Sequence, residues 1–182
     1  MKKTLTVMII GVLILSMFSV IGLALADSSV PFSVSELAQT YGGTDIDKAW
    51  SVVQTSDGGY ALTGYTCSYT YRNTGLADVY LVKTDGSGNM QWNRTYGNMY
   101  DECASSIIQT SDGGYALAGY TCTYTRADDA YLVKTNSSGN MQWSRMYGSG
   151  GLDFAYSVVQ TSDGGYLLAG YTESFGAGNK DA

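Results

Sequence analysis

The 182-residue chain contains no histidine and a single proline. Without histidine, these residues cannot build a Ser-His-Asp triad, a Cys-His pair or a histidine-based metal site. Pro31 precedes every repeated segment, so no proline interrupts the candidate strands. Basic residues are few, with 10 Lys and Arg against 16 Asp and Glu. Because no cationic patch is present, we expect no binding to nucleic acid or to anionic membrane surfaces.

Cysteine is also scarce, and its odd count of three leaves at least one thiol unpaired within the chain. Cys67 and Cys122 occupy the same place in successive repeats, and Cys103 stands apart. Equivalent residues on adjacent repeats usually lie too far apart for a bond whose Cα atoms must sit within about 7 Å. We therefore expect no essential disulfide.

The N-terminus predicts a helical signal peptide over residues 1–26. Lys2 and Lys3 precede an apolar run over residues 5–25, and Ala24-Leu25-Ala26 predicts cleavage after Ala26. The alternative is an uncleaved anchor, since about 20 apolar residues span a bilayer. Either way the remainder is expected to be secreted or at the cell surface. No other membrane segment is expected, and residues 27–34 form a short linker.

A thirteen-residue segment occurs three times, as QTSDGGYALTGYT at 54–66, QTSDGGYALAGYT at 109–121 and QTSDGGYLLAGYT at 160–172. The Tyr-Gly pairs that begin at residues 41, 96 and 147 are spaced by 55 and 51 residues. The difference falls in one segment, which is longer at 67–78 than at 122–129. Length variation at one place indicates a surface loop on a repeated scaffold.

Each repeat predicts four short strands, which in the second unit cover residues 104–110, 115–121, 130–135 and 141–147. Period-two alternation on the fourth strand places Met90, Trp92 and Tyr96 on one face. Ser-Asp-Gly-Gly predicts a tight type I′ hairpin between the first two strands, because its glycines tolerate positive φ. The predicted turn residues are Asp57, Gly58, Gly59, Asp112, Gly113, Gly114, Asp163, Gly164 and Gly165. No helical periodicity follows the leader, so we predict an all-β fold.

We predict that these units are four-stranded antiparallel blades of a β-propeller, each of about 51–55 residues, because one such sheet cannot bury both faces alone. A β-solenoid is the alternative. Residues 35–43 align with a fourth strand and predict a leading strand, with Leu37 in the place of Trp92. Units then cover 44–97 and 98–148, with an incomplete unit at 149–182. Because about four blades are the usual minimum for a ring, we expect a partial propeller over 35–182 and a fragment of a longer protein.

Residues 78–92, DVYLVKTDGSGNMQW, are followed by Tyr-Gly and, in the next unit, by DGGY and GYT. This pattern resembles the β-propeller repeats of secreted bacterial and archaeal proteins, and its strand-turn-strand part is similar to a quinoprotein-type repeat. The resemblance implies that Trp92 and Trp143 pack between blades. Quinone-dependent dehydrogenases of that type use a calcium ion, acidic ligands and a vicinal cysteine pair. No position here matches that site, so we expect no cofactor.

Two sets of acidic residues recur just before the first and third strands: Asp47, Glu102 and Asp153, and then Asp78, Asp129 and Asp181. They could form an acidic rim at one mouth of a channel, or each could cap its own loop. The turn Asp85-Gly-Ser-Gly-Asn89 lacks the Glu that a calcium loop needs and is interpreted as a plain hairpin turn. Asn93 and Asn136 begin glycosylation sequons.

Taken together, these features predict an exported binding or scaffolding module at the cell surface, not an enzyme. Recognition of a protein or a polysaccharide is assigned to the variable loops 67–78, 122–129 and 173–181, where the repeats diverge. One alternative is part of a carbohydrate-active enzyme whose catalytic residues lie outside this chain. Another is a purely structural envelope protein.

Overall fold

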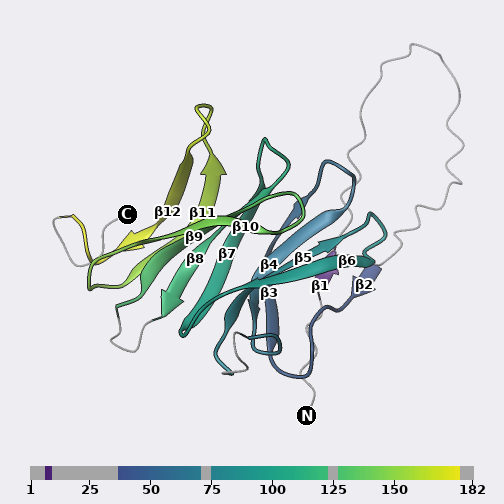
Figure 1. Ribbon diagram of the computed structural model, residues 1–182, viewed down its shortest axis with the longest axis horizontal. Coiled ribbons are helices and arrows are strands. Elements are labelled where there is room, and N and C mark those ends of the chain that lie inside the picture. Colours follow the sequence, from purple (N-terminus) through teal and green to yellow (C-terminus); the bar gives the residue numbers. More distant parts are fainter. Residues whose placement is uncertain (1–6, 10–36, 71–74, 123–126, 177–182) are drawn as a thin grey trace, which may run out of the picture.

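The computed structural model describes residues 7–9, 37–70, 75–122 and 127–176, and all regular elements in these ranges are β-strands. The all-β prediction is confirmed for this part of the chain (Figure 1). No helix long and apolar enough to cross a bilayer occurs among these residues.

Three sheets carry the repeats. Sheet I contains β3 (Asp47–Gln54), β4 (Tyr60–Thr66), β5 (Asp78–Thr84) and β6 (Met90–Tyr96). Sheet II contains β7 (Asp101–Gln109), β8 (Tyr115–Cys122), β9 (Asp129–Thr135) and β10 (Met141–Tyr147). Sheet III contains β11 (Asp153–Gln160) and β12 (Tyr166–Thr172). Neighbours along the chain pair antiparallel in every sheet, so sheets I and II are four-stranded meanders and the described part of sheet III is a hairpin.

Residues of the predicted leader are described only as β1 (Val7–Ile9), a strand that pairs antiparallel with β2 (Leu37–Gln39). The rest of the expected signal helix, with its cleavage site, lies outside the described residues. β2 falls inside the predicted leading strand at 35–43, and its partner in the structure is β1.

The hairpins between first and second strands differ from the predicted turn type. In sheet I the Gly58 amide donates to the Thr55 carbonyl at 2.9 Å, and the Thr55 amide donates to the Gly59 carbonyl at 2.9 Å. Only Gly58 has a positive φ, of 82°, and Gly113 and Gly164 repeat it at 79° and 86°. A type I turn followed by one left-handed residue gives this three-residue loop. The type I′ prediction was therefore wrong, since it requires two successive residues with positive φ.

The second glycine of the hairpins in sheets I and II is needed for a different reason. A Cβ atom at Gly59 would overlap the carbonyl oxygen of Thr84, and one at Gly114 would overlap that of Thr135. These glycines let the hairpin lie directly on the end of the third strand.

The sheets pack against one another through apolar side chains. Between sheets I and II, Val79, Leu81 and Tyr96 join Ile107 and Leu117 in one buried cluster. A second cluster joins sheets II and III and contains Ala116, Ala118, Ala130, Leu132, Ala155 and Val158. One four-stranded sheet leaves two faces exposed, and this stacking buries the inner ones.

Polar contacts at the two junctions repeat as well. The Ser51 hydroxyl accepts from the Ile107 amide at 3.3 Å, and the Ser106 hydroxyl accepts from the Val158 amide at 3.3 Å. These bonds connect the first strands of successive sheets, which lie side by side in Figure 1. The sheets of the described residues do not close into a ring.

Candidate functional site

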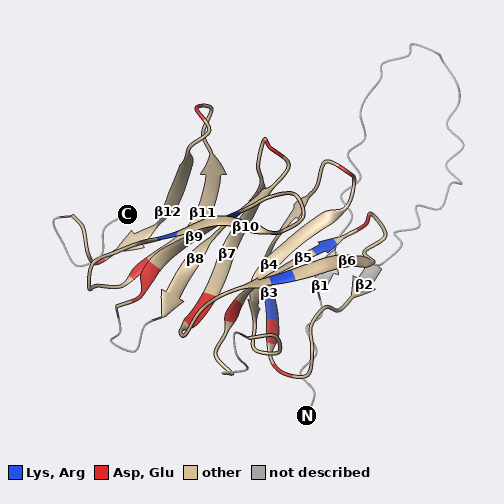
Figure 2. Ribbon diagram, in the orientation of Figure 1, with Lys and Arg blue, Asp and Glu red and all other residues tan. Residues whose placement is uncertain are grey.

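Acidic residues gather at two ends of the sheets (Figure 2). One group lies on the hairpins between first and second strands, and the other lies where the first strands begin. We call the second region the loop end, because the variable loops 67–78, 122–129 and 173–181 leave the sheets there. Residues 71–74, 123–126 and 177–182 of these loops lie outside the described residues.

The carboxylates before the first strands, Asp47, Glu102 and Asp153, are buried. Each accepts a hydrogen bond from the threonine that ends the adjacent second strand, which is Thr66, Thr121 or Thr172 respectively. Asp47 also accepts from the Gly43 amide at 2.8 Å, and Glu102 accepts from the Asn98 amide at 3.1 Å. These carboxylates therefore fasten the incoming loop to the end of the second strand.

The carboxylates before the third strands lie beside this first set, at the junctions between sheets. A Cβ atom at Gly97 would overlap the Asp78 carboxylate and come within 2.8 Å of Glu102 Oε2. Gly148 is placed in the same way between Asp129 and Asp153. The sixth predicted position, Asp181, lies outside the described residues. Asp78 is buried and Asp129 is half-buried, and an acidic rim at the mouth of a channel stays a prediction.

Close packing of carboxylates changes their protonation. Burial raises the pKa of Glu102 to about 7, and the charge of Asp78 acts in the same direction. Burial, together with the Asp153 charge, also raises the pKa of Asp129. Asp153 is also buried, but hydrogen bonds from Ser174 and Thr172 outweigh that burial and lower its pKa. Glu102 is fully buried, so its raised pKa does not place a proton donor against a substrate.

Neither end of the sheets in the described residues carries a metal-binding arrangement. No group of three or more Cys, Asp or Glu side chains in the described ranges is arranged to hold a metal ion. The Asp85 turn is closed internally, because Asp85 Oδ1 accepts from the Ser87 and Asn89 amides at 2.9 Å each. In the equivalent turn, Asn136 Oδ1 accepts from the Ser138 and Asn140 amides. Glycosylation at Asn93 and Asn136 remains a prediction.

At the hairpin end, two buried lysines form a feature that sequence reasoning missed. Lys83 Nζ donates to Asp57 Oδ2 at 2.8 Å, to the Thr84 carbonyl at 2.7 Å and to Gln91 Oε1 at 3.1 Å. Lys134 repeats the arrangement with Asp112, Thr135 and Gln142. The hydrogen bond from Lys134 is the largest cause that lowers the pKa of Asp112 to about 2. The sequence signal that could have predicted these buried ion pairs was the lysine within the otherwise apolar strand Tyr-Leu-Val-Lys-Thr.

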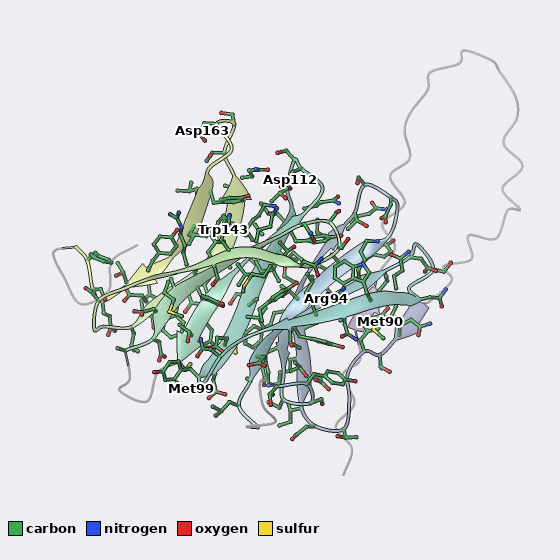
Figure 3. The ribbon with its side chains drawn as sticks, in the orientation of Figure 1. Met90, Arg94, Met99, Asp112, Trp143 and Asp163 are labelled. Atoms are coloured by element: carbon green, nitrogen blue, oxygen red, sulfur yellow. The ribbon has the colours of Figure 1, made fainter. Side chains whose placement is uncertain are left out.

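The hairpin turn of sheet III repeats the local hydrogen bonds that Asp57 and Asp112 make in sheets I and II. Asp163 Oδ1 accepts from the Thr161 hydroxyl and from the Gly165 amide. Asp163 is exposed at the end of its hairpin, beside the hairpin that carries Asp112 (Figure 3).

The predicted packing tryptophans lie between sheets. Trp92 of β6 meets Tyr115 of β8 edge-to-face at 6.0 Å, and Trp143 of β10 meets Tyr166 of β12 at 5.7 Å. The side chain of Leu37 lies outside the part that the structure describes. Both contacts join the fourth strand of one sheet to the second strand of the next.

The three thiols near the loop end are free. Burial raises the pKa of Cys103 and of Cys122 to about 12, and burial also raises that of Cys67. These cysteines are therefore neutral at physiological pH and lack the thiolate that nucleophilic chemistry needs.

An aromatic cluster at the base of two variable loops was not foreseen from the sequence. The Phe154 ring lies 4.5 Å from Tyr120 and 5.1 Å from Tyr171 by centroid distance, and Tyr156 lies 6.0 Å from Tyr171. Tyr156 is 53% exposed. The register of β11 and β12 shifts between Ala155 and Ser157, so Tyr156 sits in a bulge. The recurrent Tyr-Thr at the end of each second strand was a signal for part of this cluster.

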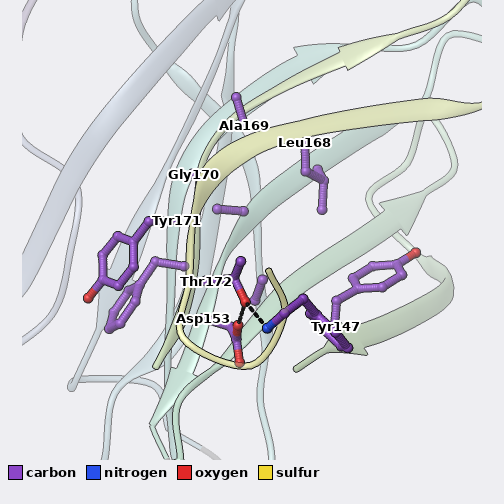
Figure 4. A pocket seen from close by; sticks show the side chains of 11 residues that line it. Tyr147, Asp153, Leu168, Ala169, Gly170, Tyr171 and Thr172 are labelled. Carbon is purple, nitrogen blue, oxygen red and sulfur yellow. Dashed lines mark hydrogen bonds between the residues drawn. The ribbon is translucent and has the colours of Figure 1, made fainter. Parts of the chain in front are cut away.

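Beside the cluster, a pocket of about 440 Å³ opens between sheets II and III (Figure 4). Its walls include Ala130 and Tyr147 from sheet II and Ala155, Leu168 and Gly170 from sheet III. The lining is mostly apolar, with Asp153 hydrogen-bonded to Thr172 at one side.

No known protein-family model matches the chain, and no curated protein sequence is detectably similar to it.

Proposed function

We propose that the sheets are blades of an exported β-propeller and that the protein is a binding or scaffolding module at the cell surface. Radial packing is supported by the first strands, because β7 contacts both β3 and β11. The Ser51 hydrogen bond joins β3 to β7, and the Ser106 hydrogen bond joins β7 to β11. The ligand in this proposal is a protein or a polysaccharide.

The position of Tyr41 supports the proposed phase, in which residues 35–43 act as a fourth strand of a preceding blade. Tyr41 OH donates to the Gly88 carbonyl at 2.6 Å, and Tyr96 OH donates to the Gly139 carbonyl at 2.7 Å. Tyr41 therefore makes the same contact with sheet I that Tyr96, the final residue of β6, makes with sheet II.

The observation that carries the binding proposal is the aromatic cluster of Tyr120, Phe154, Tyr156 and Tyr171. It joins sheets II and III where the loops 122–129 and 173–181 begin, and Phe175 of the second loop is exposed. Aromatic side chains supply large contact area at low entropic cost, and a tyrosine adds a hydroxyl for hydrogen bonding. The shared scaffold thus presents rings beside segments that differ between repeats.

Binding of the full chain to a glycan array and to extracellular proteins in a pull-down tests this proposal. Tyr156→Ala is expected to weaken any specific binding at least fivefold. Met146→Ala is the matched control, because it removes an apolar side chain of similar exposure from β10. A blank array together with an empty pull-down, or equal loss in both variants, would contradict the proposal.

A further inference from the structure

The first strand of each repeat carries one extra residue at the same position. The pairing register shifts once in β3, in β7 and in β11, always at the residue that stands between an alanine and a serine. The extra residues are Trp50, Ser105 and Tyr156. A bulge bends its strand and changes the direction of the extra side chain. Three equivalent side chains are therefore turned in the same way relative to their own sheets.

The middle copy shows that this position is open to solvent even where the sheet has neighbours on both sides. Sheet II packs against sheet I through one apolar cluster and against sheet III through another. Ala104 and Ile107 of β7 are buried, and Ser105 between them is only half-buried. β7 is an edge strand, because it pairs with β8 alone among the described residues. The bulge position therefore lies at the open edge of the first strand.

Two of the three bulge positions hold an aromatic ring that other rings support. Trp50 is 45% exposed and meets Tyr65 edge-to-face at 5.3 Å between ring centroids. Tyr156 stacks on Phe154 at 6.2 Å and also contacts Tyr171. Because the supporting rings restrict the exposed ones, little side-chain freedom remains to be lost when a ligand binds.

The three bulge positions form a row across the sheets. β7 contacts β3 and β11, so Ser105 lies between Trp50 and Tyr156 in this row. Stacked sheets lie about 10 Å apart, so two rings separated by sheet II are too far apart for one monosaccharide to touch both. The small side chain of Ser105 leaves room for a ligand that crosses sheet II. The row thus suits an elongated ligand that presents a flat face to each ring.

Charge along the first strands favours an uncharged ligand. Lys48 is the only Lys or Arg of β3, β7 and β11, and its Nζ atom lies 5.6 Å from the centroid of the Tyr65 ring. An anionic polymer would therefore find few cations along the row. The carboxylates three residues before the bulge positions, Asp47, Glu102 and Asp153, are buried. They offer no exposed partner to a basic peptide.

We propose that Trp50 and Tyr156 bind an uncharged polysaccharide of β-linked pyranose rings in the gluco configuration, which lies along the row from sheet I to sheet III. The ring substituents of such a chain are equatorial, so each sugar presents an apolar face of C–H groups that packs on an aromatic ring. The Ser105 hydroxyl is placed to bond with a sugar hydroxyl between the two rings. This inference rests on the proposed binding function and narrows its ligand to a polysaccharide.

Isothermal titration of the full chain with cellohexaose and with chitohexaose tests the proposal, and glucose and N-acetylglucosamine are the monomer controls. Saturable binding of at least one hexasaccharide is expected, with its monomer at least tenfold weaker. No binding of either hexasaccharide at millimolar concentration would overturn the proposal, as would equal binding of the monomer. If both hexasaccharides fail while a protein from the pull-down binds through Tyr156, the proposed function stands and the polysaccharide assignment is wrong.

Substitutions at the bulge positions separate the row from general stickiness of the surface. Trp50→Ala and Tyr156→Ala should each weaken hexasaccharide binding at least fivefold. Val52→Ala is the matched control, because Val52 is similarly exposed on the same strand, and its affinity should stay within twofold of the wild type. Ser105→Tyr should tighten binding, since it adds a third ring to the row. A loss in Tyr156→Ala with no change in Trp50→Ala would confine binding to the aromatic cluster of the proposed function and overturn the row.

Discussion

The buried carboxyl of Glu102 predicts that the protein loses stability as the pH rises toward neutrality. Glu102 is fully buried beside Asp78, and Asp101 also raises its pKa. The pKa is about 7 in the folded chain against an ordinary value of 4.5. The folded state therefore binds the proton more tightly than the unfolded state. The contribution to stability is complete below about pH 4.5 and is lost as the pH rises through about 7.

The size of this effect follows from the shift of the pKa. Each pKa unit corresponds to about 1.4 kcal/mol, so the free energy of unfolding should fall by about 3 kcal/mol across the window. Glu102→Gln removes the titration but keeps a side chain of the same shape. Its amide oxygen still accepts from the Asn98 amide, and its NH₂ group can donate to the Thr121 hydroxyl.

Urea unfolding of the wild type and of Glu102→Gln between pH 4.5 and 8 measures the difference. Because the other carboxylates titrate in both proteins, the gap between the two curves isolates Glu102. We expect the wild type to become less stable than the variant by an increasing margin as the pH rises. Parallel curves for Glu102→Gln, or a gap of the opposite sign, would refute the reasoning.

Three further predictions concern contacts within and between the sheets. Asp112→Asn should destabilise the chain by about 1–2 kcal/mol in chemical unfolding, because the buried Lys134 ammonium loses its counter-charge while solvent at the half-exposed Asp112 screens part of the interaction. Combining it with Lys134→Met should recover part of the loss, and an additive double variant would contradict the pairing. Gly59→Ala should cost about 1–3 kcal/mol, since its Cβ would strike the Thr84 carbonyl, and an unchanged midpoint would show that the hairpin moves freely. Trp143→Ala should lower the free energy of unfolding by about 2–4 kcal/mol, because it removes the contact with Tyr166 of sheet III. A loss below about 0.5 kcal/mol, as is usual for a surface residue, would show that this ring does not hold the two sheets together.

The strands of the second unit show how far local sequence patterns reach. The predicted strands at 115–121, 130–135 and 141–147 lie within one residue of the observed bounds of β8, β9 and β10. The first strand begins three residues earlier than predicted, at Asp101. Turn glycines and period-two alternation are local signals, and the threefold repetition of one segment made them unambiguous.

The turn type between the first and second strands was predicted wrongly because two turn geometries are compatible with the same four residues. Ser-Asp-Gly-Gly can form a two-residue type I′ turn or a three-residue loop in which only the first glycine has positive φ. The choice depends on what the hairpin rests upon. Gly59 lies against the Thr84 carbonyl, which comes from a strand that the turn sequence does not contain.

By itself, the sequence determined the all-β class, the antiparallel order of each unit and the scarcity of chemistry that needs histidine, because these depend on composition and on neighbours along the chain. Only the tertiary structure decided that Lys83 is a buried partner of Asp57, that Glu102 is shielded from solvent and that Tyr120 meets Phe154. Those properties arise where two sheets or two distant strands meet. Burial and Coulomb interactions depend on distances across these contacts. A period-two pattern shows which side chains of a strand share one face, but it does not show which residues that face contacts.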